Sequence, residues 1–340
     1  MKLAYLILVH NAPHHLSRLI NRLDGPNVVF LIHIDKKSDI GPFINAVKKA
    51  DNIHFIKNRI NIYWRGYSIV KATLELMKAA QKYHANYNIL LSGSDYPIKS
   101  NRYIHNFLGK SELEYISFFR FSDRPAWMKK VEQYHYLDSR LTNPFGYHKT
   151  AWRYRWLQMK SAQLLPKRKF IKNMIPYGGS EWWMITDRCV KYILEFIENN
   201  KHFVNFFKYT DAPDELVFQT IIMNSSFARN VINWEHYQNK IEREKLHATW
   251  PCPASVYNYR YIDWSRERSN GPGHPVVLDE RDFEALIASH CLFARKFDPI
   301  RSKVVLDLID SYIDKENRLL NNIPDIMDTQ PDILRTTLEQ

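Results

Sequence analysis

The stretch Asn88-Ile89-Leu90-Leu91-Ser92-Gly93-Ser94-Asp95-Tyr96-Pro97-Ile98 decides the fold. Its apolar part, Ile89 to Leu91, predicts a short buried strand, and Pro97 prevents that strand from continuing. Ser94 and Asp95 therefore follow the carboxyl end of a strand, which is where open α/β sheets bind ligands. A polar turn in which Asp95 bonds its own backbone explains the same residues. The local chemistry does not separate these two interpretations.

Polar residues also follow two other predicted strands. Leu3 to Val9 and Val28 to Ile34 are apolar on both faces, as central parallel strands are, and they lead into His10 and Asp35. The segment between them has the apolar spacing of an amphipathic helix, so βαβ units and a parallel sheet are predicted. Because parallel strands share a direction, the three polar exits meet at one edge of the sheet. The sequence thus predicts a ligand cleft there.

The composition limits the class of protein. The chain has 340 residues, of which 45% are hydrophobic and 14% aromatic, enough for one large α/β domain. Its net charge of +12 favours phosphate-bearing ligands, nucleic acid or an anionic membrane surface. The positive charges are dispersed and form no long basic block, so we expect no nucleic-acid partner.

The cysteines and the first residues indicate a compartment. Cys189, Cys252 and Cys291 are odd in number and far apart, which argues against a disulfide scaffold or a structural zinc site and favours a reducing environment. The apolar run at the start lacks a small-residue cleavage site, and no segment is long enough to cross a membrane. We therefore predict a cytoplasmic protein, with peripheral attachment to the inner face of the membrane as an option for its basic surface.

Three later motifs carry charged or aromatic groups. Gly178-Gly179-Ser180-Glu181-Trp182-Trp183 allows a tight bend that leads into an apolar strand. Asp211 and Pro213 are helix-start signals, and Glu215 would lie in the first helical turn, where an acid is favourable without any function. Arg295-Lys296 stands between apolar neighbours, so the pair suits either a diphosphate or plain solvation at a helix end.

Six segments in order resemble the core-2/I-branching enzyme family, which includes β-1,6-N-acetylglucosaminyltransferases and peptide O-xylosyltransferases. Together they span roughly residues 3 to 300, and the chain would be a bacterial-type member because it has no anchor, stem or disulfide framework. The segments are His33-Ile34-Asp35-Lys36-Lys37-Ser38, Trp64-Arg65-Gly66-Tyr67-Ser68, Leu91-Ser92-Gly93-Ser94-Asp95-Tyr96-Pro97-Ile98, Gly179-Ser180-Glu181-Trp182-Trp183, Pro213-Asp214-Glu215 and Phe293-Ala294-Arg295-Lys296-Phe297.

The resemblance implies a fold and a reaction. The fold would be GT-A-like, an α/β fold with a mostly parallel central sheet flanked by helices. Residues 1–121 would form its nucleotide-binding βαβ half, 122–314 its acceptor-binding and catalytic half, and 315–340 a polar tail. The reaction would be inverting transfer of N-acetylglucosamine or xylose from a UDP-sugar to a hydroxyl of a glycan, glycolipid or peptide. No cofactor and no divalent metal is implied, and no Asp-x-Asp pair follows a predicted strand.

The resemblance also assigns roles to residues. Glu215 matches the general base, and Arg295 and Lys296 match the groups that neutralise the leaving diphosphate. The predicted acceptor or sugar contacts are Glu181, Trp182 and Trp183. The predicted nucleotide-sugar cleft comprises His10, Asp35, Arg59, Trp64, Ser94 and Asp95. Arg65 departs from the family, because xylosyltransferases usually have a glycine at that position.

Two other classes of function fit parts of the sequence. A metal-dependent phosphoesterase or hydrolase could use His10, His33, Asp35 and Asp95, and it would lose activity with a chelator. A non-catalytic carbohydrate-binding module could use the aromatic and basic surface, although an intact Glu215 argues against it.

Overall fold

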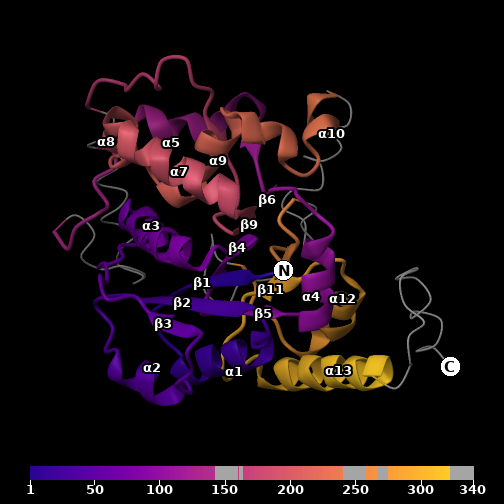
Figure 1. Cartoon of the computed structure of the whole chain (residues 1–340). Helices are drawn as coiled ribbons and strands as arrows, with labels where there is room; N and C mark the ends of the chain where they lie inside the picture. Colours follow the sequence, from indigo (N-terminus) through magenta and orange to yellow (C-terminus); the bar gives the residue numbers. More distant parts are fainter. Residues whose placement is uncertain (142–159, 161–163, 240–256, 266–274, 322–340) are drawn as a thin grey trace.

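A six-stranded mixed sheet forms the centre of the protein, as shown by a computed structural model that describes residues 1–141, 160, 164–239, 257–265 and 275–321 (Figure 1). The strand order is β3-β2-β1-β4-β9-β6, in which β1, β2, β3 and β4 run parallel and β9 and β6 add antiparallel pairings. The strands are β1 (Leu3–Val9), β2 (Val28–Ile34), β3 (Ile53–Phe55), β4 (Tyr87–Ser92), β6 (Tyr115–Ile116) and β9 (Trp183–Thr186). The predicted α/β class with a mostly parallel sheet is confirmed.

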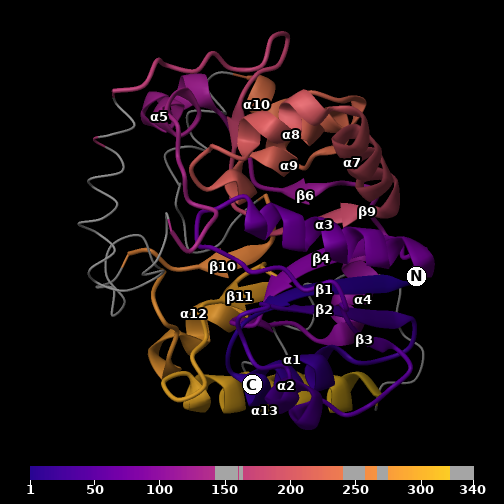
Figure 2. The ribbon, with the colours of Figure 1, turned by 90° about the vertical axis from the view of Figure 1, so that its left-hand side faces the viewer.

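Helices cover both faces of this sheet (Figures 1 and 2). One face packs against α3 (Ser68–Ala80), α7 (Asp187–Asn199), α8 (Lys201–Phe207) and α9 (Val217–Met223). The other packs against α1 (Pro13–Leu23), α2 (Gly41–Ala46), α4 (Asn101–Gly109), α12 (Phe283–Ala288) and α13 (Lys303–Asn321). The short helices α5 (Met128–Glu132) and α10 (Trp234–Gln238) lie beside the first group. The helical layers therefore bury both faces of the central strands.

The alternation of side chains divides the central strands between two cores. Along β1, Tyr5 and Ile7 point into the core that includes α1 and α13, whereas Leu6 points into the core that includes α3 and α7. This alternation follows from the two-residue period of a strand, and it explains why the whole of β1 and β2 is apolar.

A second, smaller sheet lies at the carboxyl ends of the parallel strands. Its order is β10 (Arg260–Ile262), β11 (Phe293–Arg295), β5 (Asp95–Pro97), and a separate pair joins β7 (Phe119–Arg120) to β8 (Tyr177–Gly178). As expected, β4 does not continue through Pro97, since it ends at Ser92. Pro97 belongs to the separate strand β5, where it lies opposite Phe293 in an antiparallel edge strand. A proline fits an edge strand, where its missing N–H is tolerated.

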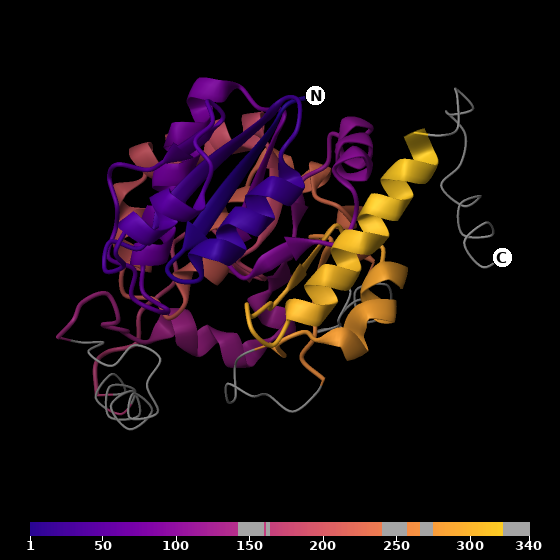
Figure 3. The ribbon, with the colours of Figure 1, turned by 90° about the horizontal axis from the view of Figure 1, so that it is seen from below.

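The last helix is longer than predicted. An amphipathic helix was expected near Val304 to Ile313, followed by a tail, but α13 continues to Asn321. Seen from below in Figure 3, α13 crosses the molecule beside α1. The rest of the predicted tail, 322–340, lies outside the described residues, as do Cys252 and most of the middle segment 142–163. Within the described residues, no helix has the length and apolarity needed to cross a membrane.

Candidate functional site

The predicted strand exits do meet at one edge of the sheet. The register pairs Val9 with Ile34 and Leu8 with Ser92, so the residues that follow β1, β2 and β4 are neighbours. In Figure 2 the start of β1 lies on the right, and β10, β11 and α5 lie toward the left, beyond these strand ends. The segments predicted to bind the donor and those predicted to act on the acceptor therefore gather on the same side of the molecule.

His10, Asp35 and Lys296 come together at this edge. The Asp35 carboxylate accepts the N–H of Lys37 at 2.9 Å and that of Ile62 at 3.3 Å, and it pairs with Lys37 Nζ at 3.0 Å. Partial burial lowers the pKa of His10, the Asp35 charge opposes this, and Lys296 and Lys37 lower the pKa of His10 further. The pKa of His10 therefore lies below its ordinary value, and its neighbours are one carboxylate and two ammonium groups.

Arg59 binds the backbone of the loop that follows β2 at this edge. Its guanidinium donates to the carbonyl oxygens of Ile34 at 3.1 Å and Asp35 at 2.8 Å, and also to that of Ser38. These donors are thus engaged by the loop after β2. The structure assigns Arg59 to fastening that loop, where sequence analysis had predicted a cleft residue.

Asp95 is buried and does not line an open cleft. Its carboxylate accepts the N–H of Ser92 at 2.8 Å and the hydroxyl of Ser92 at 3.0 Å, which is the backbone-bonded turn that sequence analysis left open. It also pairs with the buried Arg260 Nη1 at 2.7 Å and lies 3.6 Å from Arg295 Nε. Asp95 thus contacts two arginines, and its place in the nucleotide-sugar cleft stays a prediction. Ser94, the next predicted cleft residue, is partly buried, and its carbonyl accepts the N–H of Phe297 at 2.9 Å.

Arg295 contacts Glu181 and Trp182 in addition to Asp95. Its Nη1 lies 3.3 Å from Glu181 Oε1, and its guanidinium carbon lies 4.3 Å from the centre of the Trp182 ring. Burial and the neighbouring Arg295 charge lower the pKa of Lys296, while Asp298 opposes the shift. Two close cations of this kind, one of them fixed by an aromatic ring and two carboxylates, suit a ligand with two or more negative charges.

The two tryptophans after Glu181 have different surroundings. Trp182 forms the platform under Arg295, whereas Trp183 is buried in the core and packs edge-on against Phe218 at 5.9 Å. Trp183 has no accessible surface in this structure, and its predicted contact with a sugar stays a prediction. Trp64 is half-buried at the start of the loop before α3, with the guanidinium carbon of Arg65 at 5.7 Å from its ring centre.

Gly179 explains how this segment reaches its neighbours. A Cβ at this position would stand 1.8 Å from the carbonyl oxygen of Ser117, and the Gly179 N–H donates to the carbonyl of Glu215 at 2.9 Å. Only a glycine permits so close an approach. The backbone of the Glu181 segment is thereby tied directly to the Glu215 segment.

Glu215 ends a short turn rather than lying in the first turn of a long helix. The turn is a 3₁₀ helix, Pro213–Glu215, preceded by Ala212 in a left-handed conformation (φ 49°) and followed by α9. Asp211 does not cap it as predicted, because its carboxylate binds Arg65 instead. The Glu215 side chain is 33% exposed and pairs with Lys130 Nζ from α5.

Two further carboxyl groups, those of Glu181 and Asp214, lie close to Glu215 and interact with it. Burial and the neighbouring carboxyl of Asp214 raise the pKa of Glu181 well above its usual value, although Arg295 opposes the shift. Burial raises the pKa of Asp214 to about 6; its hydrogen bond with Glu181 lowers that pKa, and the Glu215 charge raises it. Two carboxyl groups that lie close together cannot both ionise readily, because the two negative charges would repel each other. The site thus places two carboxyl groups with raised pKa values next to the partly exposed side chain of Glu215.

A comparison with known families places the chain. A family model described as "Core-2/I-Branching enzyme" matches residues 3–287. The chain belongs to the Core-2/I-Branching enzyme family. The match includes the segments of Asp35, Trp64, Asp95, Glu181 and Glu215, while Arg295 and Lys296 lie just beyond it. Family membership agrees with the resemblance predicted from the sequence.

Curated relatives of this Core-2/I-Branching family member include animal xylosyltransferases. Xylosyltransferase 2 from Rattus norvegicus is 24% identical over 327 residues, which cover 92% of this chain and 34% of that protein. Xylosyltransferase oxt from Drosophila melanogaster is 24% identical over 328 residues, covering 92% and 33%. The chain therefore spans about a third of the length of these relatives. They leave the expectation of a bacterial-type member untested.

A solved structure similar to this chain is the apo form of mouse Xyloside xylosyltransferase 1. It has a TM-score of 0.30 and 13% sequence identity, and the match covers 65% of this chain and 81% of that chain.

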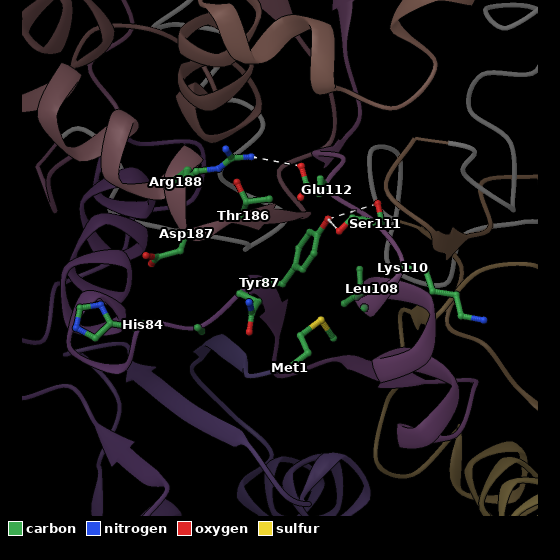
Figure 4. Close-up of a pocket in the computed structure, with 13 residues that line it drawn as sticks. Met1, His84, Tyr87, Leu108, Lys110, Ser111, Glu112, Thr186, Asp187 and Arg188 are labelled. Atoms are coloured by element: carbon green, nitrogen blue, oxygen red, sulfur yellow. Dashed lines mark hydrogen bonds and ion pairs between the residues drawn. The ribbon is translucent and has the colours of Figure 1, made fainter. Parts of the chain in front are cut away.

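A hollow of about 630 Å³ lies at the opposite end of the sheet (Figure 4). Met1, His84, Tyr87, Lys110 and Arg188 are among its lining residues, and Tyr87 begins β4. None of the predicted site residues lines this hollow. We therefore place the candidate site of this family member at the carboxyl edge of the strands, where its charged groups converge.

Sequence analysis missed three residues of this site: Lys130, Asp214 and Arg260. Lys130 was visible only as half of a lysine pair, and Asp214 only as a helix-start acid. Arg260 lies 165 positions from Asp95. A buried arginine inside an apolar strand of alternating aromatics is a signal that could have pointed to a carboxylate partner.

Proposed function

We propose that this chain is an inverting glycosyltransferase that moves a sugar, N-acetylglucosamine or xylose, from a UDP donor to a hydroxyl of a glycan, glycolipid or peptide. One observation carries the proposal: the cation Arg295 contacts Glu181, whose partner Asp214 is adjacent to the partly exposed side chain of Glu215. A diphosphate-binding group and a candidate base thus belong to one continuous site. The names of the xylosyltransferase relatives and the GT-A-like arrangement of the sheet support it.

The chemistry requires these groups on opposite sides of the reacting carbon. In this mechanism Glu215 takes the proton from the acceptor hydroxyl as its oxygen bonds to the anomeric carbon. The bond from that carbon to the UDP oxygen breaks at the same time, and its electron pair leaves with the diphosphate. Arg295 and Lys296 stabilise the charge that develops there. Attack from the side opposite UDP inverts the configuration.

The proposed transfer uses no divalent metal. Two side chains supply the positive charge, Arg295 and Lys296, and no Asp-x-Asp pair follows a strand of the sheet. In the part of the chain that the structure describes, no group of three or more His, Cys, Asp and Glu side chains is arranged to hold a metal ion. The closeness of Arg295 and Lys296 supports these two side chains as the partners of the diphosphate.

The place of action is a further part of the proposal. We place the chain in the cytoplasm, with peripheral attachment to the inner face of a membrane, and we expect no nucleic-acid partner. The net charge of +12 supports contact with an anionic surface.

A thermal-shift panel tests the donor and the metal together. Melting temperature would be measured with UDP, UDP-N-acetylglucosamine, UDP-xylose, UDP-glucose and GDP, each with and without EDTA. A ligand that binds only the folded chain at one hundred times its Kd stabilises it by about 2.7 kcal/mol. We expect stabilisation by UDP compounds but not GDP, unchanged by EDTA. No response to UDP would contradict the proposal, and a response abolished by EDTA would contradict its metal-free form.

A further inference from the structure

Arg65 makes a two-point contact that joins two loops of the candidate site. Its Nε lies 2.5 Å from Asp211 Oδ1, and its Nη2 pairs with Asp211 Oδ2. The N–H of Ala212 also donates to the carbonyl oxygen of Arg65 at 3.0 Å. Side chain and backbone of Arg65 therefore both hold residues 211–212, which immediately precede the turn of Glu215.

The contact continues from Asp211 to Glu215 through short links. The N–H of Glu215 donates to the carbonyl of Ala212 at 3.1 Å, and the N–H of Asp211 donates to the carbonyl of Lys130 at 3.2 Å. Lys130 in turn pairs with the Glu215 carboxylate. Residues 211–215 and Lys130 thus form a closed ring of contacts, and Arg65 holds this ring at residues 211–212. The position of Glu215 therefore depends on where residues 211–212 are fixed.

Asp211 is an ionised partner in a poorly hydrated place. Burial alone would raise its pKa, but the hydrogen bonds and charge of Arg65, with smaller contributions from Lys130 and His135, lower the pKa of Asp211 to about 2. A paired arginine and carboxylate in fork geometry fix relative orientation as well as distance. A single ammonium group would fix distance only.

The backbone of Arg65 adopts a conformation that is costly for a residue with a side chain. Its φ of 63° lies in the left-handed region that favours glycine. In this chain an arginine occupies the position, and its guanidinium reaches Asp211 and lies over Trp64.

We propose that Arg65 is a positioning residue for the transfer reaction, which fixes the turn carrying Glu215 through its two-point contact with Asp211. This inference rests on the proposed function, in which Glu215 is the base. Because Arg65 acts on the turn of Glu215 and not on Arg295 or Lys296, its loss misplaces the base and leaves diphosphate binding intact.

Steady-state kinetics of Arg65→Gly, Arg65→Lys and Asp211→Asn test this inference, with the donor selected by the thermal-shift panel. Glycine removes the side chain and suits the φ of 63°, so the variant is expected to fold. We expect kcat per UDP-binding molecule to fall about ten- to hundred-fold in Arg65→Gly, as misplacement of a reacting group does. The Kd for UDP should stay within about twofold of the original. Arg65→Lys, which keeps the charge but not the fork, should restore only part of the rate.

The double variant Arg65→Gly/Asp211→Asn separates positioning from general damage. If the two residues act as one unit, the double variant is no slower than the slower single variant, because the effects are not additive. Additive losses, an unchanged kcat in Arg65→Gly, or a loss confined to UDP affinity would each overturn the positioning role while wild-type turnover stands. Wild-type protein without UDP-sugar turnover would overturn the proposed function, and the role of Arg65 with it.

Discussion

At the scale of the residue, Glu215 and Lys296 are expected to do separable work. Glu215 pairs with Lys130, whereas Lys296 lies near His10 and Arg295. Glu215→Gln keeps the size of the side chain and removes its basicity. We expect kcat to fall by about 10²- to 10⁴-fold with little change in the Kd for UDP.

Lys296→Met is the matched comparison for that prediction. It removes one cation next to the proposed diphosphate, so the Kd for UDP should rise along with the loss of rate. Isothermal titration with UDP and initial rates of UDP release measure both quantities. Full turnover in Glu215→Gln would refute the role of the base, and an unchanged Kd in Lys296→Met would refute the diphosphate contact.

The same scale shows how far local sequence patterns reach. The pattern correctly predicted that Asp95 follows a strand. It did not predict the buried ion pair of Asp95 with Arg260, because Arg260 lies far away in the chain. Asp211 has the residue type and position of a helix cap, yet Arg65 from a distant loop binds its carboxylate. Charged side chains choose their partners in three dimensions, so their roles cannot be predicted from neighbours in sequence.

At the scale of the element, apolar runs were predictive because their burial is nearly complete. The bounds predicted for β1 and β2 match the structure, since a parallel strand covered on both faces must be apolar throughout. The order of the sheet was not predictable beyond β4, because β9 joins it antiparallel from the second half of the chain. The role of α13 was also missed, although its charged stripe was present in the sequence.

The helix α13 is held against α1 by ion pairs around Asp310. Asp310 lies 2.6 Å from Arg18 Nη2 and 2.8 Å from Arg22 Nε, and it accepts the hydroxyl of Tyr96 in β5 at 2.8 Å. Its side chain is 20% exposed. We expect Asp310→Asn to lower the free energy of unfolding by about 1–3 kcal/mol, because it weakens charge-assisted bonds in a poorly hydrated place.

Asp314→Asn is the control on the same face of α13. Asp314 is 49% exposed and pairs only with Arg22 Nη1, at 2.7 Å, among the described residues. An exposed pair of this kind contributes about 0–1 kcal/mol. Urea unfolding of both variants measures the difference. Equal losses would show that α13 is not fastened chiefly through Asp310.

At the scale of the whole molecule, buried carboxyl groups make stability depend on pH. Glu114 is buried between β6, β9 and the start of α7, where it accepts the N–H of Thr186 at 2.8 Å and its hydroxyl at 2.6 Å. Burial raises the pKa of Glu114 to about 7, and the bonds from Thr186 only partly oppose this shift. Asp214, with a pKa raised to about 6, adds an effect of the same sign.

The sign of this dependence follows from proton binding. Between the ordinary pKa of a glutamate and about 7, the folded state holds a proton that the unfolded chain has released, so stability falls as pH rises. The stabilisation that arises from the raised pKa of Glu114 is fully present below about pH 4.5 and is lost as pH rises through 7. It amounts to about 3 kcal/mol at most. Urea unfolding of Glu114→Gln from pH 5 to 8.5 should therefore give a flatter curve than the unchanged chain. Glu112→Gln serves as the control, because Glu112 is 89% exposed and should leave the slope as it was. If both variants keep the original slope, the pH dependence of folding arises elsewhere in the molecule.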